Sequence, residues 1–476
     1  MTDIHKTGIF EGCFSSWDRS CSGGSFYNSK NQEYTIEIPG IRNYPDDEGY
    51  IFLYRKIKGN FILSADIEIT GKEKAGWLIR TSSDKNNPFI CVTGNKNKEV
   101  FFEYNVNKKE NILKNITEFT PEVIQLERIE NEFILKTAGN KKPFLVIGSV
   151  KLHTDDEVYV GLYVNSADSS TTTKTFFRNV RITKPAEKNF IPYTDYLGSR
   201  LEILDIESGN REIIYETPEG IEAPNWTNDG KKLIYNSRGK LFVFNINTKK
   251  IEQINTGFAV NNNNDHVLSP DGKILGISHH SKENKGLSVI YVLPVTGSDN
   301  PQQITVNGPS YLHGWSPDGK YMVFTGGRNN RYDIYKIALR SGAEICLTNN
   351  PGLDDGSEYS PDGKYIYFNS TRSGKMQIWR MKPDGTDQEQ ITDDKYNNWF
   401  PHISPDGKWI VFLSYGDDVK SDEHPYYKHV YIRLMPYPGG LPEIITYLYG
   451  GQGTLNVQSW SPDSKRIAFI SNTGKI

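Results

Sequence analysis

The sequence predicts an all-β protein of two domains, a β-sandwich followed by a six-bladed β-propeller. Three observations carry this prediction: a phrase that recurs six times in the second half, short alternating strands in the first half, and a composition rich in aromatic residues and glycine. The chain has 476 residues, of which 12% are aromatic and 42 are glycine. Such a length exceeds one ordinary core, and the composition suits short strands joined by tight turns.

A repeated phrase in the second half defines the propeller. PNWTNDGKKLIY begins at Pro224, and its relatives are HVLSPDGKILGI from His266, HGWSPDGKYMVF from His313, SEYSPDGKYIYF from Ser357, PHISPDGKWIVF from Pro401 and QSWSPDSKRIAF from Gln458. The Ser or Thr that opens each turn lies at 227, 269, 316, 360, 404 and 461, at intervals of 42, 47, 44, 44 and 57 residues. This period is typical of four-stranded propeller blades, whose apolar faces only neighbouring blades can cover.

The two ends of the repeat region indicate how the ring closes. The sixth turn is followed by one strand, 466–471, and two further strands are expected at 200–206 and 211–215. Strands from the start of the region would complete the last blade and remove a free edge. We therefore assign residues 198–476 to the propeller, with 198–217 completing its last blade.

The first 185 residues show no such repeat and predict an antiparallel sandwich. Strands are expected at 34–39, 50–54, 61–69, 76–81, 100–104, 123–128, 133–137, 158–165 and 174–182. Their spacing and the alternation of apolar residues in 61–69 favour two packed sheets. Residues 186–197, rich in polar residues and containing Pro192, are interpreted as a linker.

Two resemblances accompany these patterns. The run W-S-P-D-G-K-x-I-x-F, followed by an I-Y or I-W strand, a D-G turn and a final L/I-T, resembles the repeat of TolB-type propellers over about residues 198–476. GNFILSADI at 59–67, KAGWLIR at 74–80 and YVGL at 159–162 resemble the concanavalin-like jelly-roll modules that accompany carbohydrate enzymes. Both imply fold more than function, because TolB-type blades occur in adaptors, peptidases and a lyase family alike.

Bulk properties exclude some partners and suggest a compartment. The formal net charge is −3, which gives no general reason to bind nucleic acid or an anionic membrane. The sequence has neither an apolar core of signal-peptide length at its start nor an apolar stretch that could span a membrane, so a cytoplasmic location is expected. The four cysteines are interpreted as reduced thiols, with pairing of Cys13 and Cys21 as the alternative in an oxidising compartment.

Candidate site residues gather in the loops that lead into the first strand of each blade. Those loops share one mouth of the channel, and counting back from each turn places histidines or glutamine there. We expect a divalent metal, such as Mn²⁺, Fe²⁺ or Zn²⁺, to be bound by His266, His313, His402 and Gln458. Catalytic roles are expected for Asp265, Asp355 and Glu358, and substrate binding for Asn264, Tyr311, Arg328, Trp399 and Asp354.

One further segment could cover this mouth. The acidic insertion at 415–428 lengthens the fifth blade and contains His424. It is interpreted as a solvated loop, with a cap over the site as the alternative.

The leading hypothesis is a carbohydrate-associated protein, a metal-assisted lyase or hydrolase of acidic oligosaccharides. The residue types are similar to those of the oligogalacturonate lyase family, whose propeller uses His and Gln as metal ligands. The alternatives are a non-catalytic adaptor that binds a protein or peptide, a sugar-binding module without turnover, and a polar channel that binds only water. Clustered His, Asp and Gln favour the first, because protein-binding surfaces are enriched in aromatic residues and arginine.

Overall fold

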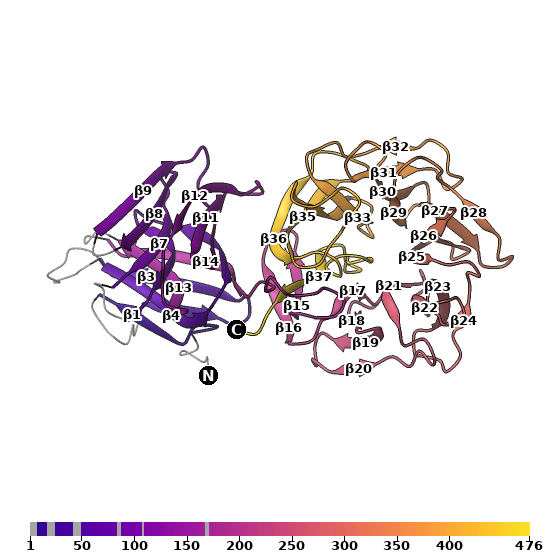
Figure 1. Cartoon of the computed structure of the whole chain (residues 1–476), viewed down its shortest axis with the longest axis horizontal. Coiled ribbons are helices and arrows are strands. Elements are labelled where there is room, and N and C mark those ends of the chain that lie inside the picture. The colour runs from indigo at the N-terminus through magenta and orange to yellow at the C-terminus, as the bar shows by residue number, and fades with distance from the viewer. Residues whose placement is uncertain (1–6, 17–23, 41–48, 83–86, 107–108, 167–170) are drawn as a thin grey trace. The chain divides into compact units, whose positions relative to one another are not determined.

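The computed structural model describes the chain except residues 1–6, 17–23, 41–48, 83–86, 107–108 and 167–170 (Figure 1). The described residues form strands and turns without a helix, so this part of the chain contains no helix that could cross a membrane. They divide into two compact units, one made mainly of residues 1–185 and the other mainly of residues 186–475. The all-β prediction is confirmed.

The described residues of the first unit form two antiparallel sheets. One sheet has the order β1 (Gly12–Ser15), β4 (Gly49–Lys58), β13 (Glu157–Ser166), β6 (Lys74–Arg80), β7 (Phe89–Gly94), β8 (Glu99–Val106) and β9 (Lys109–Ile116). The other has the order β12 (Leu145–Lys151), β11 (Glu132–Ala138), β10 (Val123–Ile129), β5 (Phe61–Ile69), β14 (Thr173–Thr183), β3 (Glu33–Ile38) and β2 (Ser25–Asn28).

One apolar core joins these two sheets. Trp77 on β6 is fully buried, and its indole Nε1 donates to the carbonyl of Ile124 on β10 of the other sheet at 3.2 Å. Leu63 on β5 and Val160 on β13 belong to the same buried cluster. Because both sheets turn alternate side chains into one core, the unit is a β-sandwich, as predicted.

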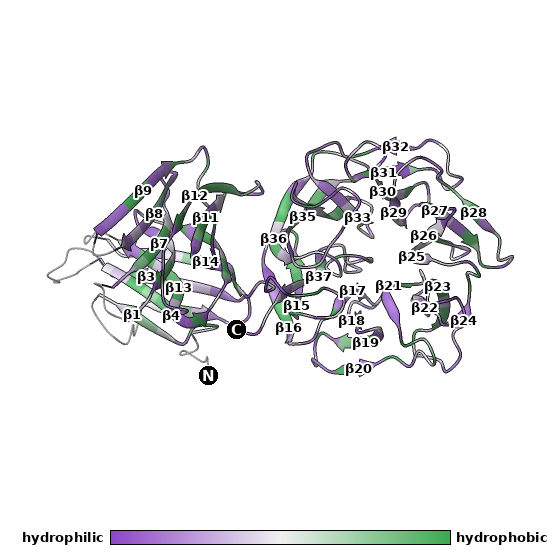
Figure 2. Cartoon of the chain, in the orientation of Figure 1, coloured by the Kyte–Doolittle hydropathy of each residue, from purple (hydrophilic) through white to green (hydrophobic). Residues whose placement is uncertain are grey.

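The sandwich has strands that the sequence did not indicate, namely β1, β2, β7, β9 and β12. Strand β9 shows the reason, because it exposes apolar side chains such as Ile112 (65%) and Ile116 (76%) among charged ones and has no buried face. Figure 2 shows β9 mostly in the purple of hydrophilic residues. A correction concerns the cysteines: Cys13 on β1 is disulfide-bonded, whereas Cys91 and Cys346 are free. Cys21 lies outside the described residues.

The second unit is a six-bladed propeller. Five blades are four-stranded antiparallel sheets: β17 (Glu222–Trp226), β18 (Lys232–Ser237), β19 (Lys240–Asn245) and β20 (Ile251–Gln253); β21 (Asn262–Leu268), β22 (Ile274–His280), β23 (Ser288–Pro294) and β24 (Gln302–Gln303); β25 (Ser310–Trp315), β26 (Tyr321–Arg328), β27 (Arg331–Ala338) and β28 (Glu344–Cys346); β29 (Asp354–Tyr359), β30 (Ile366–Ser370), β31 (Gln377–Met381) and β32 (Glu389–Gln390); β33 (Asn397–Ile403), β34 (Trp409–Tyr415), β35 (Lys428–Pro436) and β36 (Glu443–Gly450).

The last blade combines strands from both ends of this region. Its sheet has the order β16 (Arg211–Thr217), β15 (Gly198–Asp205) and β37 (Arg466–Thr473), and Trp460 forms a bridge with Ile467. Figure 1 shows the first strands of the blades on the inside of the ring and the fourth strands on its outside. The inner strands therefore line the channel.

The Ser-Pro-Asp-Gly phrase forms one defined turn. In the third blade, Oγ of Ser316 donates to Oδ1 of Asp318 at 2.7 Å, and that oxygen accepts the N–H of Lys320 at 3.1 Å. Gly319 closes the turn with a φ of 68°, a left-handed conformation that glycine adopts without strain. The Ser–Asp distance is also 2.7 Å at Ser269, Ser360 and Ser404.

Candidate functional site: a polar cluster at the channel mouth

The inner strands of five blades are irregular near their N-terminal ends. Their pairing with the second strand shifts register between Glu222 and Asn225, Asn262 and His266, Leu312 and Gly314, Asp355 and Glu358, and Trp399 and His402. Three residues at these bulges have positive φ, namely Ala223 (55°), Gly356 (64°) and Phe400 (56°). A bulge redirects side chains that regular alternation would send to opposite faces, so polar side chains converge at one mouth of the channel.

His313 and Asp355 form the centre of this convergence. Nε2 of His313 lies 3.0 Å from Oδ1 of Asp355. The same carboxylate oxygen accepts the Oγ1–H of Thr325 at 2.6 Å and the N–H of Gly356 at 2.8 Å. Both side chains are largely buried, with 5% and 13% exposed. Because His313 lies on β25 and Asp355 on β29, their contact joins two blades.

The insertion in the fifth blade adds His424. Its Nδ1 donates to Oε1 of Gln452 at 2.5 Å, and its Nε2 lies 3.9 Å from Oδ2 of Asp355. Its ring packs edge to face against Trp399, with centroids 4.4 Å apart. The side chain is 25% exposed, so this part of the insertion covers the site and is not the solvated loop that the sequence indicated.

Glu222 and Asp265 complete the group. Oε1 of Glu222 accepts the hydroxyl of Tyr426 at 2.8 Å. Asp265 is 6% exposed, and its Oδ2 accepts Nδ2–H of Asn263 at 2.6 Å. We call Glu222, Asp265, His313, Asp355 and His424 the channel-mouth cluster.

Burial and charge move the pKa values of this cluster in opposite directions. Burial raises the pKa of Glu222 to about 7 and that of Asp265 to about 6, the latter against the opposing charge of His313. Burial also disfavours ionisation of Asp355, but its hydrogen bond with His313 and the charge of His313 lower its pKa to about 2. Burial lowers the pKa of His313, but the negative charge of Asp265 and the contact with Asp355 outweigh this effect, so the pKa is raised. Burial lowers the pKa of His424.

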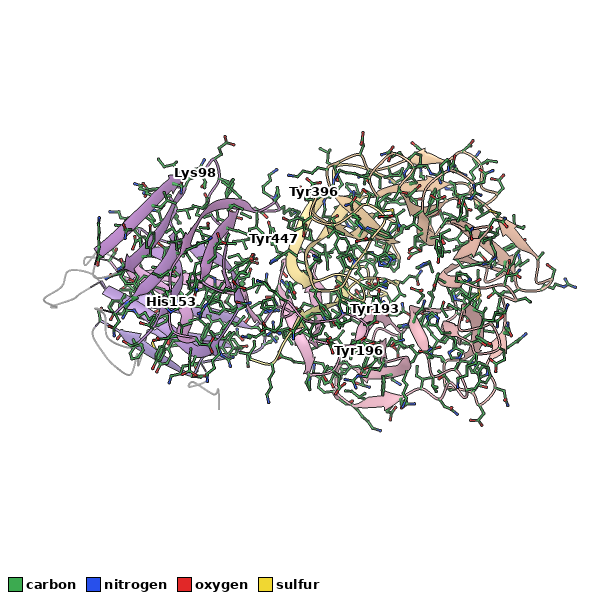
Figure 3. The ribbon with its side chains drawn as sticks, viewed as in Figure 1. Lys98, His153, Tyr193, Tyr196, Tyr396 and Tyr447 are labelled. Carbon is green, nitrogen blue, oxygen red and sulfur yellow. The ribbon has the colours of Figure 1, made fainter. Side chains whose placement is uncertain are left out.

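Aromatic residues lie beside the cluster. The rings of Tyr193 and Tyr426 pack edge to face with centroids 4.9 Å apart, and those of Phe190 and Tyr427 with centroids 5.2 Å apart. Tyr193 is 67% exposed, and Figure 3 shows it within the outline of the propeller. The segment 186–197, interpreted from sequence as a linker, therefore packs on the propeller near its channel mouth.

Two residues expected to bind substrate lie close to the cluster. Burial raises the pKa of Tyr311, and the negative charges of Asp265 and Asp355 add to this effect. Asn264 is 4% exposed and hydrogen-bonds with the Tyr426 hydroxyl, whose pKa burial raises.

Two expected metal ligands have other partners. Nδ1 of His402 lies 2.7 Å from Oε2 of Glu358, and its Nε2 lies 3.0 Å from the carbonyl of Leu455. Glu358 also accepts the N–H of Ile403 at 3.2 Å, so this buried pair connects blades rather than facing a ligand. Nε2 of His266 lies 3.3 Å from the carbonyl of Ile234, and burial lowers the pKa of His266 to about 4.

Four other expected residues have structural partners of their own, although Trp399 among them also packs against His424 of the cluster. Asp354 forms an ion pair with Arg372 at 2.7 Å. Arg328 donates to the carbonyl of Pro309 at 2.7 Å and therefore fixes the loop of its own blade. Trp399 is fully buried and offers no free face to a sugar. The main-chain carbonyl of Gln458 accepts Nδ2–H of Asn225 at 2.7 Å.

Glu222, Tyr426 and Gln452 were not among the expected site residues. A signal for Glu222 existed, because counting back five residues from each turn Ser or Thr gives Glu222, Asn264, Tyr311, Asp355, Trp399 and Asn456. Glu222 thus occupies the same repeat position as Asp355. Tyr426 and Gln452 lie in segments that the repeat does not contain, so their approach to the site follows from the fold alone.

The donor set expected for a metal is not assembled. In the described ranges, no group of three or more His, Cys, Asp and Glu residues is placed to hold a metal ion. His402 uses both ring nitrogens on protein acceptors, and His266 directs Nε2 at a carbonyl.

Known proteins resemble the propeller. Residues 312–422 match the TolB beta propeller domain family. An uncharacterized protein of Agrobacterium fabrum is 47% identical over 273 residues, which is 57% of this chain and 92% of that protein. A solved structure from Agrobacterium tumefaciens, described as that of a candidate TolB, is 45% identical with a TM-score of 0.57, and the match covers 59% of this chain and 100% of that one.

The TolB protein of the Tol-Pal system of Francisella tularensis is more distant. It is 28% identical over 157 residues, which is 32% of this chain and 35% of that protein. The chain thus spans about a third of the length of this relative.

Proposed function

We propose that this chain, which belongs to the family of TolB-like β-propeller proteins, binds a small hydroxyl-rich ligand, an oligosaccharide, at the channel-mouth cluster. The fold of this family supports many activities, so the proposal rests on the cluster itself. One observation carries the proposal. Within the described residues, Oε2 of Glu222, Oδ1 of Asp265 and Oδ2 of Asp355 accept no hydrogen bond, although the other oxygen of each carboxyl does. These three oxygen atoms are not sealed from solvent, so the hydroxyl groups of a sugar can donate to them in place of water.

The pKa values of the cluster suit proton transfer as well as binding. Burial raises the pKa of Glu222 to about 7 and that of Asp265 to about 6, close to the range in which a group can both give and take a proton near neutral pH. Two carboxyl groups of this kind can hydrolyse a glycosidic bond, one protonating the departing oxygen while the other assists the attacking water. We propose hydrolysis of an oligosaccharide without acidic groups as the reaction that accompanies binding.

An acidic substrate is less well supported. Within the described residues, Glu222 and Asp265 form no ion pair, and Asp355 pairs with His313 and His424 alone. A uronate carboxylate would meet these acidic groups without an arginine or lysine to neutralise it, and like charges repel. A divalent metal could supply that charge, but the residues expected to hold one do not fit it, so no step of the proposed reaction involves a metal.

Calorimetric titration with oligosaccharides without acidic groups, followed by assay of new reducing ends, tests the proposal. Wild-type chain is expected to bind one of them, and Asp265→Asn together with Glu222→Gln to weaken binding about tenfold or more. Asp271→Asn, in an exposed turn of the second blade, is the matched control and should bind normally. Equal binding by the double variant and the control would contradict the proposal.

The TolB relatives favour a second candidate, an adaptor that binds a protein or peptide on the propeller. It predicts a peptide ligand whose affinity survives the Glu222→Gln and Asp265→Asn substitutions. A peptide-array screen with both proteins distinguishes the two candidates. A peptide that loses binding to the double variant would place recognition at the cluster and count against an independent adaptor surface.

A further inference from the structure

The channel-mouth cluster has an excess of acidic groups over basic ones. Three carboxyl groups, those of Glu222, Asp265 and Asp355, face two imidazoles, and burial lowers the pKa of His424, so its ring is mostly neutral at pH 7. The only cation that the described residues supply is therefore His313. Enclosed negative charge without a partner is unfavourable, and a ligand that brings positive charge would relieve it.

The hydrogen bonds of the cluster show the same deficit in donors. His424 donates through Nδ1 to Gln452, so its neutral form leaves Nε2 as an acceptor, and this atom faces Oδ2 of Asp355 at 3.9 Å. A donor group of a ligand that lies between these two acceptors can bond to both.

An aromatic ring, that of Tyr193, lies near Glu222 of the cluster. Tyr193 has a positive φ of 70°, a conformation that is uncommon for a tyrosine. Its turn is fixed by Asp195, whose Oδ2 accepts the N–H of Ile191 at 3.0 Å and whose N–H donates to the carbonyl of Ile191 at 2.8 Å. The turn holds the 67% exposed ring against Tyr426, which itself contacts Glu222. An exposed tyrosine beside carboxylates is suited to bind a cation through its π face.

From these contacts we infer that the ligand carries a protonated primary amine, as an amino-sugar oligosaccharide does, and that Tyr193 supplies an aromatic wall for it. The ammonium group supplies positive charge and N–H donors to free carboxylate oxygens of the cluster, and the hydroxyl groups of the sugar can donate to the others. The inference rests on the proposed function and adds the charge of the ligand to it. It also gives Tyr193, a residue of the segment 186–197, a direct contact with the ligand.

The test compares ligands that differ only in charge. The full-length chain is titrated at about pH 7, where Asp265, with a pKa of about 6, is mostly ionised and Glu222, with a pKa of about 7, is partly ionised, while an amine with a pKa of about 8 is still mostly protonated. The probes are a glucosamine tetrasaccharide, its fully N-acetylated counterpart, and 1,4-diaminobutane. The amino sugar is expected to bind about tenfold or more tightly than the acetylated sugar. Glu222→Gln should remove most of this preference while keeping an acceptor for Tyr426, and Asp271→Asn should retain it.

Tyr193 is tested by two substitutions of the same position. Tyr193→Phe keeps the ring and should bind the amino sugar like wild type, because no hydrogen bond of its hydroxyl occurs among the described contacts. Tyr193→Ala removes the ring and should weaken binding about twofold to fivefold, the range expected for an exposed cation–π contact. Thermal unfolding of each variant shows that the fold is intact.

The outcomes separate this inference from the proposed function. Equal affinity for the two tetrasaccharides overturns the amine inference and leaves oligosaccharide binding in place. Binding of diaminobutane alone, lost in Glu222→Gln, supports the amine and overturns the sugar. If none of the three probes binds, both proposals fail. Equal losses in Asp271→Asn and Glu222→Gln would mean that the amino sugar binds the acidic surface in general, which also overturns the inference.

Discussion

The hydroxyl of Tyr426 donates to Oε1 of Glu222 at 2.8 Å, and this bond links the insertion of the fifth blade to the inner strand of the first. The two residues are 204 positions apart in sequence. The bond holds the insertion over the channel mouth and favours the ionised form of Glu222, whose pKa burial raises. One contact therefore affects both the cover of the site and the charge inside it.

Replacing Tyr426 by phenylalanine is expected to raise the pKa of Glu222 above its value of about 7. The hydrogen bond stabilises the carboxylate, so its loss favours the protonated acid. The variant should also lose about 1 kcal/mol of folding free energy. Carboxyl-carbon NMR titration of Glu222 measures the shift.

Tyr427 provides the matched control for this change. Its hydroxyl accepts the N–H of Leu197 at 3.2 Å and makes no hydrogen bond to Glu222. Tyr427→Phe should leave the titration of Glu222 where it is in wild type. If Tyr426→Phe also leaves it there, the bond has no electrostatic role.

The stability of the propeller is expected to fall as pH rises through the titration of Glu222. Its pKa is raised from 4.5 to about 7 in the folded state, so its contribution is fully present below about 4.5 and lost as pH approaches 7. The loss amounts to at most about 3 kcal/mol, and partial exposure of Glu222 reduces it. Asp265, raised from 3.8 to about 6, acts with the same sign over its own range.

Comparison with Glu222→Gln isolates this effect. His266 acts with the opposite sign, because burial lowers its pKa from 6.5 to about 4 and its contribution is lost as pH falls through that window. Both proteins contain His266, so the difference between them reports on position 222. Urea unfolding near pH 4.5 and pH 8 should show the variant gaining stability relative to wild type at the higher pH. A constant difference would argue against a raised pKa.

The fold could be predicted because each blade contains the same short turn, which forms from neighbouring residues alone. The Ser316 turn needs only its own Asp318 and Gly319 to form, and the same three residue types recur at a period that matches a blade. In the sandwich, β9 was missed because neither of its faces is buried, and β1 because it has only four residues.

The site was predicted in part, since Asp265, His313 and Asp355 do come together. Glu358 and His402 were expected beside them, because side chains alternate regularly between the two faces of a regular strand. The bulges interrupt this alternation just before both residues. After a bulge, the next polar side chain can point between blades rather than into the channel. His424 and Tyr426 come from an insertion, whose path no periodicity specifies.

Glu358 is expected to affect stability and not ligand binding. Its carboxylate is 3% exposed and accepts from His402 and from the N–H of Ile403. Glu358→Ala leaves both donors buried without a partner, which should cost about 3 kcal/mol or more. Urea unfolding measures this loss, and calorimetry on the folded variant should give the wild-type affinity. Loss of affinity with unchanged stability would instead show that Glu358 takes part in ligand binding.

Chelation is expected to leave ligand binding unchanged, because the nitrogen atoms of His402 already bond Glu358 and the carbonyl of Leu455. His313 directs Nε2 at Asp355, and its charged form cannot bind a metal. Titration of protein purified without chelator or nickel, before and after EDTA treatment, measures the effect, with metal content determined by mass spectrometry. Near-stoichiometric Mn, Fe or Zn that disappears in His266→Ala/His313→Ala would contradict this expectation. It would also show that the inner strands rearrange when a metal binds, because the contacts of His266 and His402 with their carbonyls would have to open first.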